Sequence, residues 1–439
     1  MPLLISWSEL TSAKVGLWGM GVEGTASLHR LAAAGNVPVL VDDAPTASTI
    51  EGHDVLATAS GGLDALLRCD VVVKSPGISR YRSEVSQLEA TGIPVRGGLG
   101  LWLEDANHPH IACITGTKGK STTTAIAGHL LTRLGYAARV GGNIGQPPWE
   151  PSAKREPDFW VIETSSYQVP DLTTGPSVVA VTSLSPDHLD WHGSVERYYA
   201  DKLSICTKPG VEVALANGSD ETLRAHADVL GTHVQWVEAT DVPWFAALGL
   251  PGQHNLRNAA MAQAVLKALG IAEVTDQEAM SEAAQGFNGL PSRCYSLGRI
   301  DGVEFIDDSL STNVLPAQVA LEAFSDRPVA LLVGGHDRGL DYSSLGDAVA
   351  RRTLPTLIVT MPDNGPRIGQ AIASVASSQH KVIDAANLTE AVTLAFEWSV
   401  PGGVVLLSPA APSFGHFTDY RDRARVFADA ASELGELTP

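Results

Sequence analysis

The chain is poor in basic residues and has no long apolar run. Its 30 Lys+Arg stand against 49 Asp+Glu, which gives a formal net charge of −19 over 439 residues. Such a charge repels nucleic acid and anionic membranes, so an anionic ligand must be met by a local group of cations. No apolar segment reaches the ~18 residues that span a bilayer, and the first residues carry no basic n-region. We therefore expect a soluble, cytoplasmic protein with no nucleic-acid partner and no membrane insertion.

Cysteine is scarce as well. Cys69, Cys113, Cys206 and Cys294 are far apart and form no CxxC pair. This spacing indicates neither a zinc site nor a disulfide framework, and it favours small buried side chains. The sequence also has no repeat of 20 to 50 residues of the solenoid kind.

One segment predicts a phosphate-binding loop. The apolar run Ile111–Thr115 leads into Gly-Thr-Lys-Gly-Lys-Ser-Thr at 116–122, and helix-forming residues follow. Gly116 and Gly119 let several backbone N–H groups point at one anion, Lys120 adds a charge, and the Ser121 hydroxyl can serve Mg²⁺. The glycines are three residues apart, which is shorter than the G-x-x-x-x-G-K-[ST] spacing of ordinary P-loops. The segment therefore predicts that the protein binds a nucleoside triphosphate.

A second glycine loop lies near the start of the chain. Gly19-Met-Gly-Val-Glu-Gly24 separates the apolar strand 15–18 from a helical run, and another strand ends at Asp42. The same sheet is expected to carry the turn Ser75-Pro-Gly77 at its carboxyl edge. From the residues alone the loop fits three interpretations: a dinucleotide site with Asp42 on a ribose, a packing turn, or the seat of a second phosphorylated ligand.

Apolar strands alternate with helical patterns along the whole chain, which indicates an α/β fold class. The length, divided by ~150 residues per domain, suggests three domains, and the 44% hydrophobic content can fill several cores. We expect an N-terminal Rossmann-like domain at 1–98, a central P-loop ATPase-like parallel sheet at 99–289, and a C-terminal Rossmann-like domain at 290–439. The third sheet should be parallel too.

Three further residues suit a magnesium site. Glu163 ends an apolar strand, where a buried carboxylate is costly unless a cation pairs with it. His188 follows another strand, with Asp187 and Asp190 beside it, and Lys202 lies on the next helical segment. Equally, His188 fits a loop imidazole bonded to backbone, and Lys202 fits a solvated surface lysine. The residues alone leave these alternatives open.

These motifs occur in one order over nearly the whole chain, together with Gly142-Asn-Ile-Gly-Gln146 and Gly252-Gln-His-Asn-Leu-Arg-Asn258. In combination they resemble the Mur ligases. The resemblance implies a UDP-substrate-binding domain, a central ATP-binding domain and an amino-acid-receiving domain, and it accounts for the shortened P-loop. The size of the first domain and the Ser75–Gly77 turn resemble the branch that adds glutamate to UDP-N-acetylmuramoyl-L-alanine.

The resemblance also implies roles for individual residues. The ATP-binding set is Gly116, Thr117, Lys118, Gly119, Lys120, Ser121, Thr122, Asn255, Asn258, Arg293 and Asp308. The UDP-substrate set is Gly19, Met20, Gly21, Val22, Gly24, Asp42, Ser75, Pro76, Gly77, Asn143 and Gln168. Two Mg²⁺ ions are implied, one on Ser121 and Glu163 and the other on His188 and a carbamylated Lys202. The implied catalytic residues are Lys120, Glu163, His188 and Lys202. ATP would phosphorylate the alanyl carboxylate, and the glutamate amine would then attack the acyl phosphate.

The amino-acid-receiving domain departs from the pattern of D-glutamate-adding members. Leu310 and Arg338 each stand where that pattern has lysine, and the last strand opens into Ala411-Pro-Ser-Phe414. Inverting the α-carbon moves the amine and the two carboxylates, so a site for the other enantiomer needs its cations moved. The combination resembles the L-glutamate-adding variant, whose product a separate epimerase converts.

Arg338, Thr312, Ser413 and Tyr420 are the expected glutamate-binding residues, and Tyr420 equally fits ordinary packing. The alternatives are the D-glutamate-adding ligase, a folate polyglutamate ligase and a nucleotide-binding scaffold without catalysis. Intact Lys120, Glu163, His188 and Lys202 argue against the scaffold. We expect a monomer.

Overall fold

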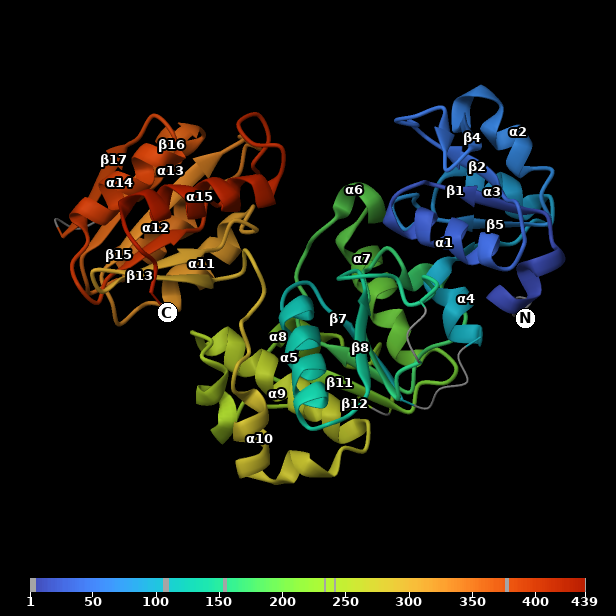
Figure 1. Cartoon of the computed structure of the whole chain (residues 1–439), viewed down its shortest axis with the longest axis horizontal. Helices are drawn as coiled ribbons and strands as arrows, with labels where there is room; N and C mark the ends of the chain where they lie inside the picture. The colour runs from blue at the N-terminus through green and yellow to red at the C-terminus, as the bar shows by residue number, and fades with distance from the viewer. Residues whose placement is uncertain are drawn as a thin grey trace. The chain divides into compact units, whose positions relative to one another are not determined.

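The computed structural model describes residues 5–105, 110–152, 156–232, 234–240, 242–375 and 379–438. They form three six-stranded sheets with helices packed around them (Figure 1). The chain divides into two compact units, Met1–Ala247 with Leu256–Gln285, and Leu248–Asn255 with Gly286–Pro439. The first unit contains the first two sheets and the second unit contains the third. The α/β fold class expected from the sequence is confirmed.

The first sheet has the order β3-β4-β2-β1-β5-β6. Its strands are β1 (Val15–Trp18), β2 (Val39–Asp42), β3 (Thr49–Ile50), β4 (His53–Ala57), β5 (Val71–Lys74) and β6 (Val95–Gly97). Its helices are α1 (Val22–Ala33), α2 (Leu63–Leu66), α3 (Ser83–Ala90) and α4 (Gly98–Asp105). All pairings are parallel except that of β3 with β4. The strands β1 and β5 are buried along their whole length, as expected for apolar runs covered on both faces.

The second sheet is parallel throughout, with the order β12-β11-β10-β7-β9-β8. Its strands are β7 (Ile111–Thr115), β8 (Ala138–Gly142), β9 (Phe159–Glu163), β10 (Val178–Val181), β11 (Val213–Asn217) and β12 (Val234–Val237). Its helices are α5 (Lys120–Arg133), α6 (Leu189–His192), α7 (Val195–Leu203), α8 (Glu221–Ala225), α9 (Gln253–Ala268) and α10 (Gln277–Ala284). The carboxyl ends of β7, β9 and β10 are neighbours, which brings the predicted phosphate loop, Glu163 and the segment before His188 to one edge.

The third sheet has the order β13-β14-β18-β15-β16-β17. Its strands are β13 (Tyr295–Ile300), β14 (Val303–Asp307), β15 (Val329–Gly335), β16 (Thr356–Asp363), β17 (His380–Asp384) and β18 (Val404–Leu407). Its helices are α11 (Val314–Glu322), α12 (Ser343–Ala350), α13 (Gly365–Ala373), α14 (Leu388–Trp398) and α15 (Tyr420–Leu434).

The prediction of a parallel third sheet is wrong at one edge, where β13 pairs antiparallel with β14. The two strands are joined by Asp301 and Gly302, which both have positive φ, at 49° and 78°. An Asp-Gly pair in this conformation makes the tight hairpin turn that matches strand twist. The dipeptide was the sequence signal for this hairpin.

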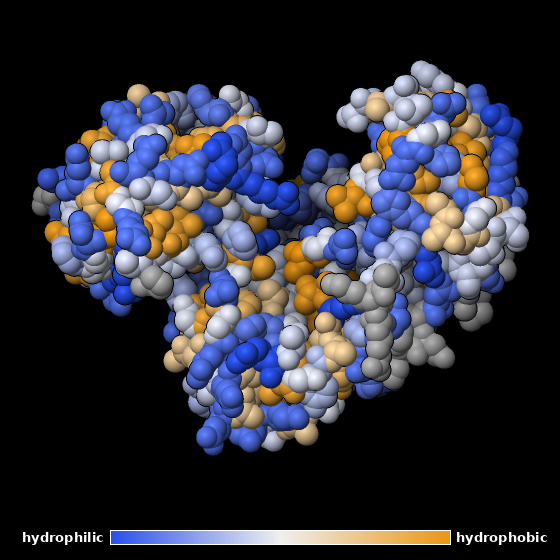
Figure 2. All heavy atoms as spheres, in the orientation of Figure 1, coloured by the Kyte–Doolittle hydropathy of each residue, from blue (hydrophilic) through white to orange (hydrophobic). Residues whose placement is uncertain are grey.

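Hydrophilic side chains cover much of the visible surface, with apolar side chains interspersed (Figure 2). Among the described residues, no helix is both long and apolar enough to cross a bilayer. The four cysteines are free and buried, as their spacing predicted.

Candidate active site

The phosphate loop depends on two glycines whose backbone conformation would strain any other residue. Gly116 and Gly119 have φ of 138° and 89°. A Cβ on Gly116 would lie 2.2 Å from Thr182 Oγ1, and one on Gly119 would lie 2.5 Å from Asn258 Oδ1. The loop opens directly onto the N-terminus of α5, a helix of 14 residues. Backbone N–H groups and the helix dipole therefore favour an anion at this place.

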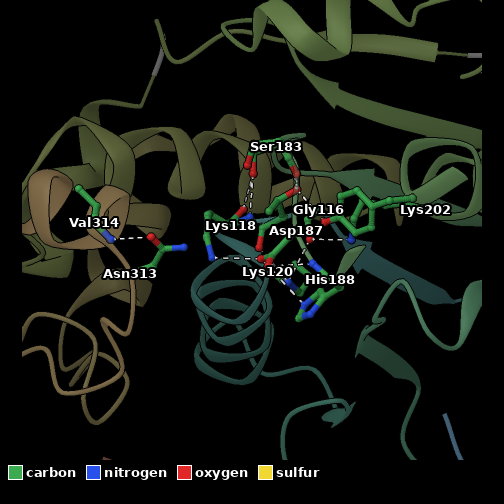
Figure 3. Close-up of polar contacts among 12 residues, drawn as sticks. Gly116, Lys118, Lys120, Ser183, Asp187, His188, Lys202, Asn313 and Val314 are labelled. Atoms are coloured by element: carbon green, nitrogen blue, oxygen red, sulfur yellow. Dashed lines mark hydrogen bonds and ion pairs between the residues drawn. The ribbon is translucent and has the colours of Figure 1, made fainter. Parts of the chain in front are cut away.

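Two lysines meet at the loop. Lys120 Nζ donates to the carbonyl oxygens of Gly116 and Thr117, at 3.0 and 3.1 Å. Lys202 on α7 reaches the same Gly116 oxygen at 3.0 Å (Figure 3). Its side chain is buried, and burial, followed by the charge of Lys120, holds the pKa of Lys202 well below its ordinary value. The interpretation of Lys202 as a solvated surface lysine is therefore wrong. Lys118 is exposed and lies 3.4 Å from Asp187.

Glu163 ends β9 and is 1% exposed. Asn143 Nδ2 donates to Glu163 Oε1 at 2.7 Å, while Oε2 is buried and has no hydrogen-bond partner in the described part of the chain. Gly142, with φ of 89°, lets the turn that carries Asn143 pass close to the end of β9. A Cβ on Gly142 would lie 2.4 Å from the Glu163 carbonyl oxygen. A buried carboxylate oxygen without a partner fits a cation, because its desolvation otherwise goes uncompensated.

His188 has positive φ, 53°, and precedes the first turn of α6. Its Nδ1 lies 2.7 Å from the Tyr167 hydroxyl, and its Nε2 lies 3.9 Å from Asp187 Oδ2. Burial lowers the pKa of His188 below its usual value, an effect that Asp187 opposes and Lys202 strengthens. A neutral imidazole is the form that can bind a metal.

The donor set suits magnesium only in company with other ligands. Within the described ranges, no three His, Cys, Asp or Glu side chains gather as a ready-made metal centre. Mg²⁺ usually takes one or two carboxylates and completes its shell with water and substrate phosphates. The unpartnered Glu163 oxygen, next to a phosphate loop that places buried Ser121 at the start of α5, fits that arrangement.

Hydrogen bonds from nearby polar groups hold the Gly19–Gly24 loop of the first sheet in place. Met20 N–H donates to Asp42 Oδ2 at 2.7 Å, and the Ser75 hydroxyl donates to the Gly19 carbonyl at 2.5 Å. A Cβ on Gly24 would lie 2.0 Å from that carbonyl oxygen. The predicted residues Gly19 to Gly24, Asp42 and the turn Ser75–Gly77 are therefore brought together, and Val22 is 73% exposed between them.

Contacts between the first two sheets link this loop to the second sheet. Gln168 Nε2 donates to Glu23 Oε1 at 2.7 Å, and Trp191 Nε1 donates to the Pro76 carbonyl at 3.1 Å. Asn258 lies against the phosphate loop, with its Oδ1 3.4 Å from Thr123 Oγ1. Asn255 donates to the Pro251 carbonyl within the short segment that groups with the second unit.

In the second unit the predicted glutamate site draws on three neighbouring strands, β14, β18 and β15. His336 N–H donates to the Pro412 carbonyl at 3.0 Å, and Gly335 approaches the same oxygen so closely that a Cβ would lie 2.4 Å from it. The segments that carry Arg338 and Ser413 are therefore adjacent. Arg338 is exposed and Ser413 is buried, and Thr312, Leu310 and Tyr420 are half-buried.

Sequence reasoning missed Arg423, which is completely buried on α15. Its Nη1 donates to the Ala411 carbonyl at 3.0 Å and its Nη2 to the Ser309 carbonyl at 2.7 Å. One guanidinium thus ties the segment before Leu310 to the segment before Ser413. An arginine among apolar helix positions was the available signal, but its partners could not be read from the sequence.

Asp308 is buried beneath this edge, while Arg293 is exposed. Ser408 Oγ donates to Asp308 Oδ2 at 2.7 Å and Cys294 N–H to Oδ1 at 3.2 Å. Burial raises the pKa of Asp308 from 3.8 to about 7, against the opposing effect of these hydrogen bonds.

A stability profile against pH is expected to report this proton. The folded chain holds it up to about pH 7, whereas an unfolded chain releases it near 3.8. The stabilisation from this group is therefore complete below pH ~4 and is lost as the pH rises through about 7. Urea unfolding at several pH values should show this slope in the wild type and not in Asp308→Asn. Parallel profiles of the two proteins would contradict the assignment.

The three sheets and the phosphate loop define a class of protein: a multidomain α/β enzyme that uses a nucleoside triphosphate. Comparison with known proteins narrows the class. Residues 114–243 match the Mur ligase middle domain, and residues 292–411 match the Mur ligase glutamate ligase domain. The chain belongs to the Mur ligase family. It is an ATP-dependent, ADP-forming amide ligase of peptidoglycan synthesis.

Two relatives and one solved structure illustrate the match. The UDP-N-acetylmuramoyl-L-alanine--L-glutamate ligase of Xanthomonas euvesicatoria is 40% identical, over 97% of this chain and 96% of its own. A protein of the same name from a Micromonospora species is 38% identical, over 97% of this chain and 98% of its own. The MurF ligase of Thermotoga maritima in complex with ADP has the same fold, with a TM-score of 0.57, 14% identity, and coverage of 99% of this chain and 98% of that one.

Proposed function

We propose that this ligase adds L-glutamate to UDP-N-acetylmuramoyl-L-alanine in the synthesis of peptidoglycan precursors. The observation that carries the proposal is that relatives named for this reaction match 97% of the chain at 38% and 40% identity. Leu310 and Arg338, which depart from the D-glutamate-adding pattern, support the choice of enantiomer.

The geometry of the third sheet is consistent with that choice. The segments that carry Leu310, Arg338 and Ser413 lie at one edge, joined by Arg423 and by the contact of Gly335 with Pro412. Arg338 offers a planar fork that can bind a carboxylate through two hydrogen bonds, where lysine offers a point charge. Thr312, Ser413 and Tyr420 complete the proposed glutamate-binding set.

The proposed reaction makes an amide by way of an acyl phosphate. The γ-phosphoryl of ATP passes to the alanyl carboxylate, which releases ADP, and the glutamate amine then displaces phosphate from the acyl phosphate. Residues 116–122 and the N-terminus of α5 hold the phosphates, and Lys120 offsets charge on the transferring group. Asn255, Asn258, Arg293 and Asp308 are the remaining nucleotide-binding residues of the proposal.

Two Mg²⁺ ions, when bound, would neutralise charge on the transferring phosphoryl group. Ser121 and Glu163 would hold one ion, which the unpartnered Oε2 of Glu163 supports. His188 and Lys202 would hold the other, once Lys202 is carbamylated. Burial lowers the pKa of Lys202, which favours the neutral amine, the form that attacks CO₂. An N–C bond forms and a proton is released, which leaves an anionic oxygen ligand.

The muramoyl substrate would lie in the first unit. Its UDP end would meet residues 19–24, Asp42 and the turn 75–77, and Asn143 and Gln168 would contact the rest. The domain boundaries of the proposal are 1–98, 99–289 and 290–439. We further propose a cytoplasmic monomer whose product passes to a separate epimerase.

Phosphate release measured with UDP-N-acetylmuramoyl-L-alanine, ATP and each glutamate enantiomer in turn tests the proposal. We expect kcat/KM to favour L-glutamate by about 10²-fold or more, since the misplaced carboxylates of the other enantiomer leave site cations unpaired. Turnover with D-glutamate alone would refute the choice of enantiomer. Nucleotide binding without turnover of either enantiomer would favour the scaffold alternative.

A further inference from the structure

The loop that follows β9 has alternating exposure. Ser166 and Gln168 are buried, at 3% exposure each, while Ser165 and Tyr167, which alternate with them, are half-buried. Gln168 accepts from the Ser165 backbone N–H at 2.8 Å and donates to Glu23. The buried residues thus anchor the loop.

The anchor at Ser166 is a relay of hydrogen bonds. Ser166 Oγ lies 3.0 Å from His192 Nε2, and His192 Nδ1 lies 2.7 Å from Asp201 Oδ2. The other oxygen of Asp201 accepts from the Tyr81 hydroxyl at 2.6 Å. Because a carboxylate only accepts, Nδ1 of His192 donates to Asp201, and Nε2 shares a hydrogen bond with the Ser166 hydroxyl. The loop is therefore tied to α6, to α7 and to the residue Tyr81 of the first domain.

Tyr167, next to this anchor, is fixed by two ring contacts. Its ring stacks on Trp191, with centroids 4.9 Å apart and planes at 26°, and on His192, at 5.8 Å and 28°. These contacts leave the phenol little freedom to swing. Its hydroxyl ends 2.7 Å from His188 Nδ1.

His188 is held on its backbone side as well. Its N–H donates to Asp187 Oδ1 at 3.0 Å, and its φ of 53° fixes the direction in which the side chain leaves. The side chain is 47% exposed, so the ring is open to a ligand. With Nδ1 engaged by Tyr167, Nε2 is the nitrogen left for that ligand, on the side of Asp187 (Figure 3).

We propose that Tyr167 is the positioning residue of His188. Its phenol oxygen accepts the Nδ1–H of the neutral imidazole, which selects the tautomer whose Nε2 lone pair is free for a divalent cation. The Asp201–His192–Ser166 relay keeps Tyr167 in place. Metal-binding histidines commonly donate their other N–H to a fixed acceptor, and removal of such a partner weakens metal binding 10- to 100-fold. The inference rests on the proposed metal role of His188.

Tyr167→Phe removes one oxygen and keeps the stacked ring, so it isolates the hydrogen bond. The first readout is the ¹⁵N spectrum of histidine-labelled, metal-free protein, with the His188 signals assigned by their absence in His188→Gln. In the wild type we expect a pyrrole-type Nδ1 and a pyridine-type Nε2. In Tyr167→Phe the ring should shift toward the Nε2–H tautomer that free histidine favours.

The second readout is Mn²⁺ binding in the presence of ADP, followed by the electron paramagnetic resonance signal of free Mn²⁺. The dissociation constant should rise about tenfold in Tyr167→Phe. Tyr199→Phe, the same deletion on α7, is the matched control and should leave both readouts unchanged. An Nε2–H tautomer in the wild type, or an unchanged tautomer or Mn²⁺ affinity in Tyr167→Phe, would overturn the inference. Neither readout needs glutamate or turnover, so failure of the proposed ligation would be seen separately.

Discussion

Lys202→Ala is expected to lower the ligation rate by about 10²- to 10³-fold, the cost of losing one group that stabilises transition-state charge. The Lys202 amine is buried, lies 3.0 Å from the Gly116 carbonyl and is close enough to Lys120 for that charge to lower its pKa. A bare amine at this place adds nothing to a magnesium shell, whereas its carbamate supplies an oxygen ligand. Phosphate release under saturating substrates is the measurement.

If Lys202 acts as a carbamate, a second result is expected for Lys202→Ala. Short-chain carboxylates added to Lys202→Ala should restore part of the rate, because they can occupy the vacated oxygen position. ¹³CO₂ should give a carbamate signal in the wild type and none in the variant. Lys267→Ala, at an exposed lysine of α9, is the control and should retain the full rate. A wild-type rate in Lys202→Ala would refute the carbamate proposal.

Lys74→Met is expected to lower the free energy of unfolding of the first unit by about 3–5 kcal/mol. The Lys74 side chain is fully buried, 2.5 Å from Asp171 Oδ2, and it donates to the Ile78 carbonyl at 3.0 Å. Arg80 is the second cation on Asp171, at 3.1 Å, and is partly exposed. Removal of Lys74 leaves a buried carboxylate with less compensation. Urea unfolding followed by tryptophan fluorescence measures the loss.

The double variant Lys74→Met/Asp171→Leu separates charge from packing. Replacing a whole buried ion pair by apolar side chains is often neutral, so the double variant should recover much of the stability lost in Lys74→Met. Arg224→Met breaks the exposed pair with Glu238 and should cost at most about 1 kcal/mol. If Lys74→Met cost no more than Arg224→Met, the buried pair would not stabilise the unit.

The parts of the fold that could be predicted from the sequence are those that depend on local patterns of neighbouring residues. The central strands appear as apolar runs because both faces of a parallel sheet are covered, and β7 has the bounds expected from its sequence. Edge strands carry weaker patterns: β8 reads Ala-Arg-Val-Gly-Gly and β12 reads Val-Gln-Trp-Val, and neither was predicted. The hairpin at Asp301 and Gly302 was missed although its dipeptide was a usable signal.

The candidate site shows the same difference between local features, which the sequence predicts, and contacts between distant segments, which it does not. Gly116, Gly119 and Glu163 could be found because a loop and a strand end are local features, and their geometry agrees with the chemistry expected of them. The partners of Lys74 and Arg423 and the Tyr167–His188 contact could not be found. Each contact joins segments that are distant in sequence and that only the folded sheets bring together. The residues around a lysine, an arginine or a tyrosine do not indicate which distant residue it will contact.

The carbonyl oxygen of Gly116 accepts a hydrogen bond from both Lys120 Nζ and Lys202 Nζ. These hydrogen bonds restrict the rotamers of both long side chains. Each Nζ carries more than one N–H, so a lysine can donate to an incoming oxygen while it keeps its bond to this carbonyl. The loss of rotamer freedom, which for such side chains reaches about 1.5–2 kcal/mol each, belongs to folding rather than to binding. One backbone oxygen thus holds the side chains of two lysines of the proposed site before the loop binds a ligand.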